Sequence, residues 1–231
     1  MPSNNASQIK LNEISQSFQT GQRKVVLFEK LSCVINRGQS YAIVGPSGSG
    51  KSSLLMLASG LEKPSSGSID YLENGQRMPM QVLREDIGFI FQQFHLLPEL
   101  NALNNVALPL KLRGIADAEQ KAELWLQKVG LGHRLLHQPK QLSGGEQQRV
   151  AIARALVFEP KFIFADEPTG NLDASSADDV ITCLFSCCQD HGAGLILVTH
   201  SDSLASRADH LLTFVNGQCN VALKQTEEVI C

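Results

Sequence analysis

Short apolar runs recur along this chain, and each is bounded by turn residues or by charges. A strand that is buried on both faces shows such a continuous run rather than an alternating one. Helical patterns separate the runs, so we predict an α/β protein with a central parallel sheet. The predicted strands of this sheet are Ser40–Val44, Ile87–Phe91, Lys161–Ala165 and Leu195–Thr199.

Weaker alternating patterns near the start of the chain predict a second, antiparallel β layer. They cover Ile9–Phe18, Val25–Ile35 and Ser68–Leu72. Glycine- or proline-containing turns separate the three segments, as expected for strands that fold back on one another.

The other end of the chain carries a hairpin pattern. His210–Val215 and Gln218–Leu223 flank Asn216-Gly217, and Asn-Gly between two apolar runs is typical of a tight hairpin turn. Residues 224–231 are expected to form a loose tail.

The pattern becomes helical over residues 96–154. The clearest helix is predicted at Ala118–Val129, and the prolines in this region, Pro109 among them, are expected to break helices. We therefore expect a helical subdomain inserted into an otherwise continuous fold. The predicted organisation is a single domain over 1–231, with a core formed by 8–95 and 155–223 and the insert at 96–154.

Composition and charge narrow the functional classes. The 231 residues are 43% apolar and 19% charged, which is ordinary for a folded soluble protein. The net charge of −3 does not favour nucleic-acid binding, which needs a basic surface. No apolar stretch approaches the ~18 residues of a membrane span. The N-terminal segment lacks the apolar core of a secretion signal, so a cytoplasmic location is expected.

Six cysteines are scattered without a C-x-x-C pair, and we expect them to be reduced thiols. Three of them are spaced about one helical turn apart and could imitate a metal site. Small apolar residues in a helix explain them better, and no metal is assigned. The six are Cys33, Cys183, Cys187, Cys188, Cys219 and Cys231.

A phosphate-binding loop is predicted directly after the strand Ser40–Val44. Its sequence matches G-x-x-x-x-G-K-[ST] and precedes an apolar helical pattern, which is the required context. Its glycines let backbone N–H groups surround a phosphate at a helix N-terminus. Lys51 would contact the β and γ phosphates, Ser52 would ligate Mg²⁺, and Ser53 is a second phosphate contact. The loop consists of Gly45, Pro46, Ser47, Gly48, Ser49, Gly50, Lys51 and Ser52.

Two carboxylates follow another predicted buried strand. Asp166 and Glu167 come at its carboxyl end, where open α/β sheets bind ligands. Asp166 is placed to hold Mg²⁺, and Glu167 to polarise the water that attacks the γ-phosphate. His200, at the end of the next strand, could hydrogen-bond that phosphate.

A second anion-binding feature is predicted at residues 143–146. Ser143 and Glu146 form a capping box at the start of a helix. Between them, Gly144 and Gly145 cost helix stability and leave the backbone bare. We interpret this helix start as a second phosphate contact.

The segment LSGGEQQRVAIARAL at 142–156 resembles the signature of the nucleotide-binding subunits of ATP-binding cassette (ABC) transporters. The resemblance covers nearly the whole chain, because 45–53 resembles the family's Walker A motif and 162–168 its Walker B motif. It implies a P-loop NTPase fold with a RecA-like parallel-sheet core, an antiparallel β layer and an inserted helical subdomain. It also implies ATP and Mg²⁺ as cofactors.

The resemblance gives a role to each matching residue. Glu167 would be the catalytic base, with His200, Lys51 and Gln92 as its catalytic partners. Gln92 of FIFQQ matches the Q-loop, His200 the switch histidine and Asp173 the D-loop.

The remaining ligand contacts are implied in the same way. Mg²⁺ would be held by Ser52, Gln92 and Asp166. The aromatic residue that stacks on adenine in this family is best matched by Phe18, with Phe28 as a nearby alternative.

In this family two copies associate head to tail, so that each ATP lies between the Walker A loop of one copy and the signature of the other. Both half-sites are present here, in 45–53 and 143–146. A symmetric homodimer is the simplest arrangement, and pairing with a related subunit stays open.

Further stretches resemble the subgroup that serves bacterial lipoprotein-release, macrolide-export and YbbA-type complexes. This implies a permease with few membrane helices and a large periplasmic domain, which exports or extracts a hydrophobic or lipid-like molecule. The subunit would lie at the cytoplasmic face of the inner membrane and touch the membrane only through its permease. The stretches are 100–114, 166–173 and 195–209.

The permease is expected to dock around Gln92–Asn105. Apolar side chains in this segment are candidates for the contact, with packing inside the helical insert as the alternative. They are Phe94, Leu96, Leu97 and Leu100.

Two other functions are compatible with the same ATP chemistry. An ABC ATPase acting on DNA or ribosomes would usually carry two cassettes or a coiled-coil arm, and this chain has neither. A regulatory or cell-division scaffold could bind ATP without hydrolysing it, but Glu167 and His200 argue against that.

Overall fold

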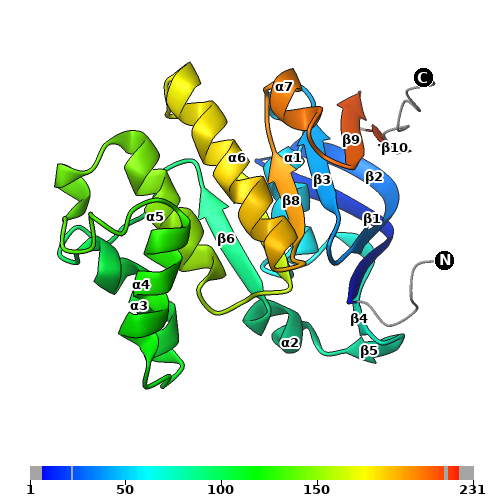
Figure 1. Cartoon of the computed structure of the whole chain (residues 1–231). Helices are drawn as coiled ribbons and strands as arrows, with labels where there is room; N and C mark the ends of the chain where they lie inside the picture. The colour runs from blue at the N-terminus through cyan, green and yellow to red at the C-terminus, as the bar shows by residue number, and fades with distance from the viewer. Residues whose placement is uncertain (1–6, 22, 216–217, 224–231) are drawn as a thin grey trace, which may run out of the picture. The chain divides into compact units, whose positions relative to one another are not determined.

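The computed structural model describes residues 7–21, 23–215 and 218–223, and it divides into two compact units (Figure 1). The first contains the residues up to Arg84 and those from Ile196 onward, and the second is Glu85–Leu195. In the described part of the chain, no helix combines the length and the apolar character that a membrane crossing requires.

The first unit contains the expected antiparallel layer. Its strands are β1 (Gln8–Thr20), β2 (Arg23–Asn36), β4 (Ser66–Glu73) and β5 (Gln76–Met78), in the order β2-β1-β4-β5. The three predicted strands are confirmed, and β5 was missed because three residues carry almost no pattern. The register of β1 shifts between Leu11 and Ile14. Glu13 has a φ of +46° there, so the buried positions change parity within the strand.

The first unit also contains a parallel strand pair with a helix beside it. Strand β3 (Ser40–Val44) pairs in parallel with β9 (His210–Val215), and β10 (Gln218–Leu223) pairs antiparallel with β9. All three have the predicted bounds, whereas the predicted turn at 216–217 and the tail at 224–231 lie outside the described residues. The helices are α1 (Lys51–Ala58), α2 (Met80–Glu85), which reaches the division between the units, and α7 (Asp202–Ala205).

In the second unit, helices gather around a parallel strand pair. Strands β6 (Ile87–Phe91) and β7 (Phe162–Asp166) pair directly. Strand β8 (Gly194–Val198), which runs past the end of this unit at Leu195, begins where the Gly194 N–H donates to the Lys161 carbonyl at 2.9 Å. In Figure 1 the helices of residues 96–156 lie next to one another, and the last of them also lies beside β6. They are α3 (Ala102–Leu112), α4 (Ala118–Lys128), the 3₁₀ helix η1 (Pro139–Gln141) and α5 (Gly144–Leu156), and α6 (Ala174–Asp190) follows β7.

One sequence-based expectation is wrong in detail. Pro109 does not break a helix but lies inside α3, which continues to Leu112. A proline removes one backbone donor and strains the preceding turn. Because α3 ends three residues after Pro109, the missing N–H donor lies in the last turn of the helix. Burial of Val106 and Leu110 outweighs the local preference.

Helix α5 lies close against strand β6, and a glycine makes the approach possible. A Cβ built on Gly88 would overlap the carbonyl oxygen of Ala155 and lie 2.6 Å from Cδ1 of Ile163. Every residue from Val150 to Ala153 on α5 is buried. The position of the helix on its strand therefore depends on the missing side chain at Gly88.

We predict that Gly88→Ala lowers the free energy of unfolding by about 1–3 kcal/mol, the usual cost of overpacking a core. Gly132→Ala is the matched control, because its Cβ would meet only the side chain and Cα of Gln127, whose side chain can rotate. Urea unfolding followed by circular dichroism measures both. Equal stability of the two variants would contradict the packing argument.

Candidate active site

The loop between β3 and α1 has the backbone of a phosphate cradle. Gly45, Gly48 and Gly50 have φ values of +150°, +77° and +98°, which L side chains rarely adopt. Gly50 is the N-cap of α1, no side chain caps this helix, and its first turn holds no acidic residue. The first N–H groups of α1 have no partner within the helix, so they are suited to bind an anion.

Two of these glycines are also required by packing. A Cβ at Gly45 would lie 2.8 Å from Cβ of Phe214, and one at Gly50 would lie 3.0 Å from Cβ of Leu27. At Gly48 nothing comes within 4 Å. The sequence motif explains the glycines by their conformation alone, whereas here the loop is also pressed against the body of its unit.

Lys51 and Ser49 supply polar atoms to this loop. The Lys51 side chain is buried, and its ammonium donates to the carbonyl oxygens of Gly45 at 3.0 Å and Pro46 at 2.9 Å. An ammonium has three donors, so these carbonyls take two of them. The Ser49 hydroxyl is buried without a hydrogen-bond partner in the described structure. A buried cation beside an unsatisfied hydroxyl fits an anionic group such as a triphosphate.

The first unit holds two further candidates. Phe18 on β1 is 45% exposed, whereas Phe28 is 1% exposed and packs edge-on against Phe214 with ring centroids 5.6 Å apart. Phe18 therefore offers a free aromatic face for stacking, and Phe28 belongs to the core. His200 is exposed directly after buried Thr199, whose N–H donates to the Ile43 carbonyl at 3.2 Å.

The second unit holds the two carboxylates. Asp166 is the last residue of β7, and both Asp166 and Glu167 are half-buried. Glu167 has a φ of +46°, and its carbonyl accepts from the Gly170 N–H at 3.0 Å. A non-glycine residue in this region costs free energy, and strained residues of this kind are found at functional sites among other places. The turn fixes the backbone of Glu167 at the carboxyl end of its strand.

Gln92 is held by Asn171, which begins the Asn171-Leu-Asp173 segment that resembles the D-loop, although the sequence did not reveal this contact. Its Nε2 donates to Oδ1 of Asn171 at 3.2 Å, and Nδ2 of Asn171 donates to the Gln92 carbonyl at 3.1 Å. Gly170 permits this approach, because a Cβ there would lie 2.6 Å from Nε2 of Gln92. The loop after β6 is therefore joined to the loop after β7.

The predicted capping box at the start of α5 is present. The Ser143 hydroxyl accepts from the Glu146 N–H at 3.2 Å, and the Glu146 carboxylate accepts from the Ser143 N–H at 2.8 Å. Arg134 adds a second donor, with its Nε 3.1 Å from that carboxylate. The hydrogen bond from the Ser143 N–H contributes most to the lowered pKa of Glu146, and the Ser143 side chain and Arg134 lower it further.

The glycine pair of this segment has a structural reason that the sequence did not reveal. A Cβ at Gly144 would lie 3.1 Å from Cδ2 of Leu172, and one at Gly145 would lie 3.3 Å from Cβ of Ser176. Small residues are therefore needed where α5 meets the start of α6. The two glycines that we interpreted as a phosphate contact therefore also allow α5 to pack closely against Leu172 and Ser176.

Asp173 caps α6. Its carboxylate accepts from the Ser175 hydroxyl at 2.7 Å and from the Ser176 N–H at 3.0 Å. These hydrogen bonds lower the pKa of Asp173, so the carboxylate is ionised at neutral pH. Helix capping therefore accounts for an aspartate at this position. A contact of Asp173 with a second copy of the chain belongs to the proposed function below.

Arg154 is a further residue that sequence reasoning missed. It lies near the end of α5, and its guanidinium donates to the carbonyls of His95 at 2.7 Å and Phe94 at 3.0 Å. Burial lowers the pKa of Arg154. A charged residue inside the run Val150–Leu156 was the available signal, because a buried charge needs partners.

Comparisons with known proteins identify the family of the chain. Residues 28–170, more than half of the chain, match the family model described as ABC transporter. The chain therefore belongs to the ABC transporter family and is an ATP-binding cassette of the kind that hydrolyses ATP.

Individual relatives fall in the expected subgroup. The ABC transporter ATP-binding protein YbbA of Escherichia coli (strain K12) is 45% identical over 225 residues, which cover 94% of this chain and 98% of that protein. The lipoprotein-releasing system ATP-binding protein LolD of Legionella pneumophila (strain Paris) is 44% identical over 212 residues, 89% of this chain and 93% of that protein.

A solved structure supports the predicted fold class. The ATP-binding cassette MJ0796, in a dimeric post-hydrolysis state bound to ADP and Pi, superposes with a TM-score of 0.80 at 32% identity. The match covers 93% of this chain and 98% of that chain. The α/β cassette fold with its antiparallel layer is thus confirmed, whereas the roles of individual residues and the division at 96–154 stay predictions.

We predict that Glu146→Ala lowers the free energy of unfolding by about 0.5–2 kcal/mol at pH 7, the usual cost of a lost cap. Glu146→Gln keeps the acceptor and loses only its charge. Because the folded protein favours the ionised carboxylate, the charge-dependent stabilisation is complete above the unfolded pKa, near 4.5, and disappears as pH falls through the folded pKa.

Urea unfolding at pH 7 and at several acidic pH values measures this difference, with Glu123→Ala on the exposed face of α4 as control. A gap between wild type and Glu146→Gln that widened on acidification would contradict the assignment.

Proposed function

We propose that this chain binds ATP with Mg²⁺ through the residues identified above. In this proposal the triphosphate is bound by the loop Gly45–Ser53, with Lys51 on the β and γ phosphates and Phe18 stacked on adenine. The single observation that supports it best is the buried ammonium of Lys51 beside the unsatisfied Ser49 hydroxyl, at a helix start without a cap.

Hydrolysis is assigned to side chains that match the family motifs. Glu167 acts as general base toward water, and His200 hydrogen-bonds the γ-phosphate. Ser52, Asp166 and Gln92 supply the hydroxyl, carboxylate and amide oxygens that suit Mg²⁺. When bound, the metal neutralises charge that develops on the phosphate oxygens.

We also propose that two copies of the chain form a head-to-tail homodimer. Ser143, Gly144, Gly145 and Glu146 of one copy would complete the phosphate contacts of the other, with Asp173 at the same interface. The dimeric state of MJ0796 supports this arrangement.

The dimer is proposed to drive an integral membrane permease from the cytoplasmic face of the bacterial inner membrane. The similarity to LolD, an ATP-binding protein of a lipoprotein-releasing system, supports a hydrophobic or lipid-like cargo and a permease with a large periplasmic domain. The alternative is a regulatory or cell-division scaffold, with ATP binding as its main role.

The proposed docking segment has an ordered backbone and an exposed apolar side chain. Buried Asn105 accepts from the Leu97 N–H at 2.8 Å and donates to the Leu97 carbonyl at 3.1 Å and the Leu100 carbonyl at 3.0 Å. Leu97 itself is 41% exposed, whereas Phe94, Leu96 and Leu100 are half-buried. Leu97 is therefore the best candidate for a contact with the permease.

We predict that Glu167→Gln abolishes steady-state ATP hydrolysis while ATP binding persists, because the amide cannot accept the proton of the attacking water. The variant should accumulate as an ATP-bound dimer in size-exclusion chromatography. Glu159→Gln is the matched control, since Glu159 is also a glutamate with positive φ, at +55°, but is exposed outside the motifs. Equal turnover of wild type and Glu167→Gln would remove Glu167 from its role.

We predict that Leu97→Glu reduces recovery of a membrane permease with the affinity-purified chain at least several-fold, because a charge would be buried in the contact. Leu136→Glu is the control, since Leu136 is 75% exposed in a different loop. Basal ATP hydrolysis of both variants should match wild type. Recovery of ribosomes or DNA, or of no membrane protein from wild type, would contradict the transport proposal.

A further inference from the structure

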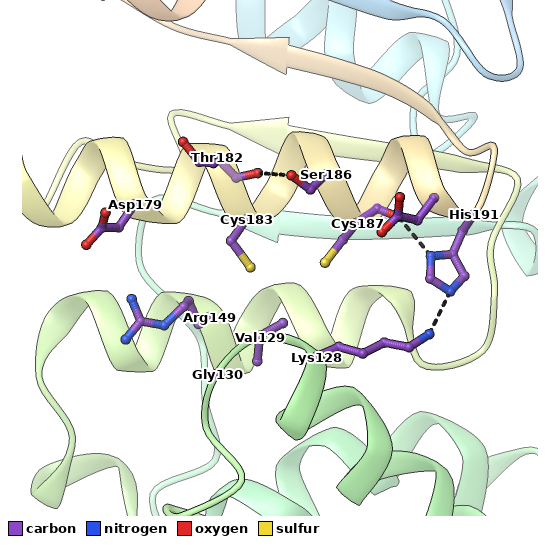
Figure 2. Close-up of a pocket in the computed structure, with 11 residues that line it drawn as sticks. Lys128, Val129, Gly130, Arg149, Asp179, Thr182, Cys183, Ser186, Cys187 and His191 are labelled. Carbon is purple, nitrogen blue, oxygen red and sulfur yellow. Dashed lines mark hydrogen bonds between the residues drawn. The ribbon is translucent and has the colours of Figure 1, made fainter.

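The second unit contains a cavity that no step of ATP hydrolysis uses. Its volume is about 570 Å³, within the ~300–1,000 Å³ range of small-molecule sites. Figure 2 shows it between α6 on one side and α5 with the end of α4 on the other. The lining residues used below are Lys128, Arg149, Asp179, Cys183, Cys187 and Asp190.

Two thiols face this cavity from successive turns of α6. In Figure 2 the sulfur atoms of Cys183 and Cys187 both point away from the helix axis toward α5. A hydrogen bond from Cys183 lowers the pKa of Cys187, with a smaller contribution from Lys128, while burial and Asp190 oppose the shift. The same hydrogen bond raises the pKa of Cys183. Of the two thiols that face the cavity, Cys187 therefore has the greater tendency to ionise.

The pair is badly placed to form a disulfide with itself. Cβ atoms four residues apart on a helix are about 5–6 Å apart, whereas a disulfide needs about 3.5–4.5 Å. Among the described residues, no three potential ligands gather into a metal-binding group. Reaction with an external sulfur compound needs neither an internal disulfide nor a metal.

The charges around the cavity are of both signs. Lys128 and Arg149 are cations on α4 and α5, and Asp179 and Asp190 are anions on α6. His191 connects the two sides, because its Nδ1 lies 2.9 Å from the Cys187 carbonyl and its Nε2 lies 3.1 Å from the Lys128 ammonium. In this arrangement Nδ1 can donate to the carbonyl while Nε2 accepts from the ammonium. Such a lining suits a small molecule that carries both carboxylates and an ammonium group.

We propose that Cys187 is a site of mixed-disulfide formation with a zwitterionic, low-molecular-weight peptide disulfide of the glutathione type. The Cys187 thiolate attacks one sulfur of the incoming disulfide, and a new S–S bond forms as the old one breaks. The second half leaves as a thiolate and takes up the proton that Cys187 had released. The exchange needs no further oxidant. It is independent of ATP binding by the same chain.

Cys187 is itself only 7% exposed, and what separates it from the thiols outside the pair is its place in the cavity and the direction of its pKa shift. Burial raises the pKa of Cys33 to about 11 and that of Cys219 to about 12. Burial also raises the pKa of the neighbouring Cys188. Thiolate formation is therefore suppressed at these three cysteines, and none of them lines the cavity.

The test is incubation of the folded full chain with glutathione disulfide at pH 7.5, followed by intact-mass spectrometry and peptide mapping. We expect one glutathionyl group on Cys187, removable by dithiothreitol, and none in Cys187→Ser. Cys188→Ser is the matched control on the same helix and should be labelled like wild type. Labelling of Cys188, Cys33 or Cys219 in preference to Cys187, or no labelling, would overturn the proposal.

A second comparison tests recognition of charge without removing the thiol. Wild type should react faster with glutathione disulfide than with neutral hydroxyethyl disulfide at equal concentration. Lys128→Met should lower the glutathione rate about threefold or more, because the cation that favours the thiolate and the carboxylates is lost. Circular dichroism of each variant confirms folding. Equal rates with both reagents, or no effect of Lys128→Met, would refute the proposed fit.

Discussion

The constraint that matters most in the first unit is the start of helix α1, to which we assign phosphate binding. Helices α3, α5, α6 and α7 are each capped by the side chain of their N-cap residue, whereas α1 begins at Gly50 with neither a cap nor an acidic first turn. The N–H groups of the first turn cannot bond within the helix, and the helix dipole adds partial positive charge there, so such a start favours an anion. The buried Lys51 ammonium increases the same demand for negative charge.

The start of α5 satisfies its own N–H groups in a different way. Ser143 and Glu146 bond to each other's backbone, and Arg134 neutralises the carboxylate. A helix that has this internal cap is stable without ligand, so it can present its glycines to a second molecule as a preformed surface. The two helix starts thus differ in what they need: α1 has no side-chain cap, whereas α5 is capped by its own residues.

Much of this fold could be predicted from the sequence because strong local patterns determine it. The bounds of β3, β6, β9 and β10 follow from apolar runs between turn residues, and the phosphate loop follows from a specific motif. The short elements β5, α2 and α7 were missed because three to six residues carry too little periodicity.

The partners within the site were also missed, for a different reason. Asn171 lies 79 residues from Gln92, and Arg154 lies 59 residues from His95, so only the folded chain brings them together. Local pattern identifies which residue types carry chemistry, and long-range contacts decide what holds them in place.

Helix α5 has a consequence for movement within its unit. Its first turn contains Gly144 and Gly145. Arg154, close to its last turn, donates hydrogen bonds to the carbonyls of Phe94 and His95, which follow Gln92. Thirteen helical residues span roughly 20 Å at about 1.5 Å per residue. A displacement of that segment would therefore move the helix as one rigid element, and its opposite end, where the glycines lie, would shift with it.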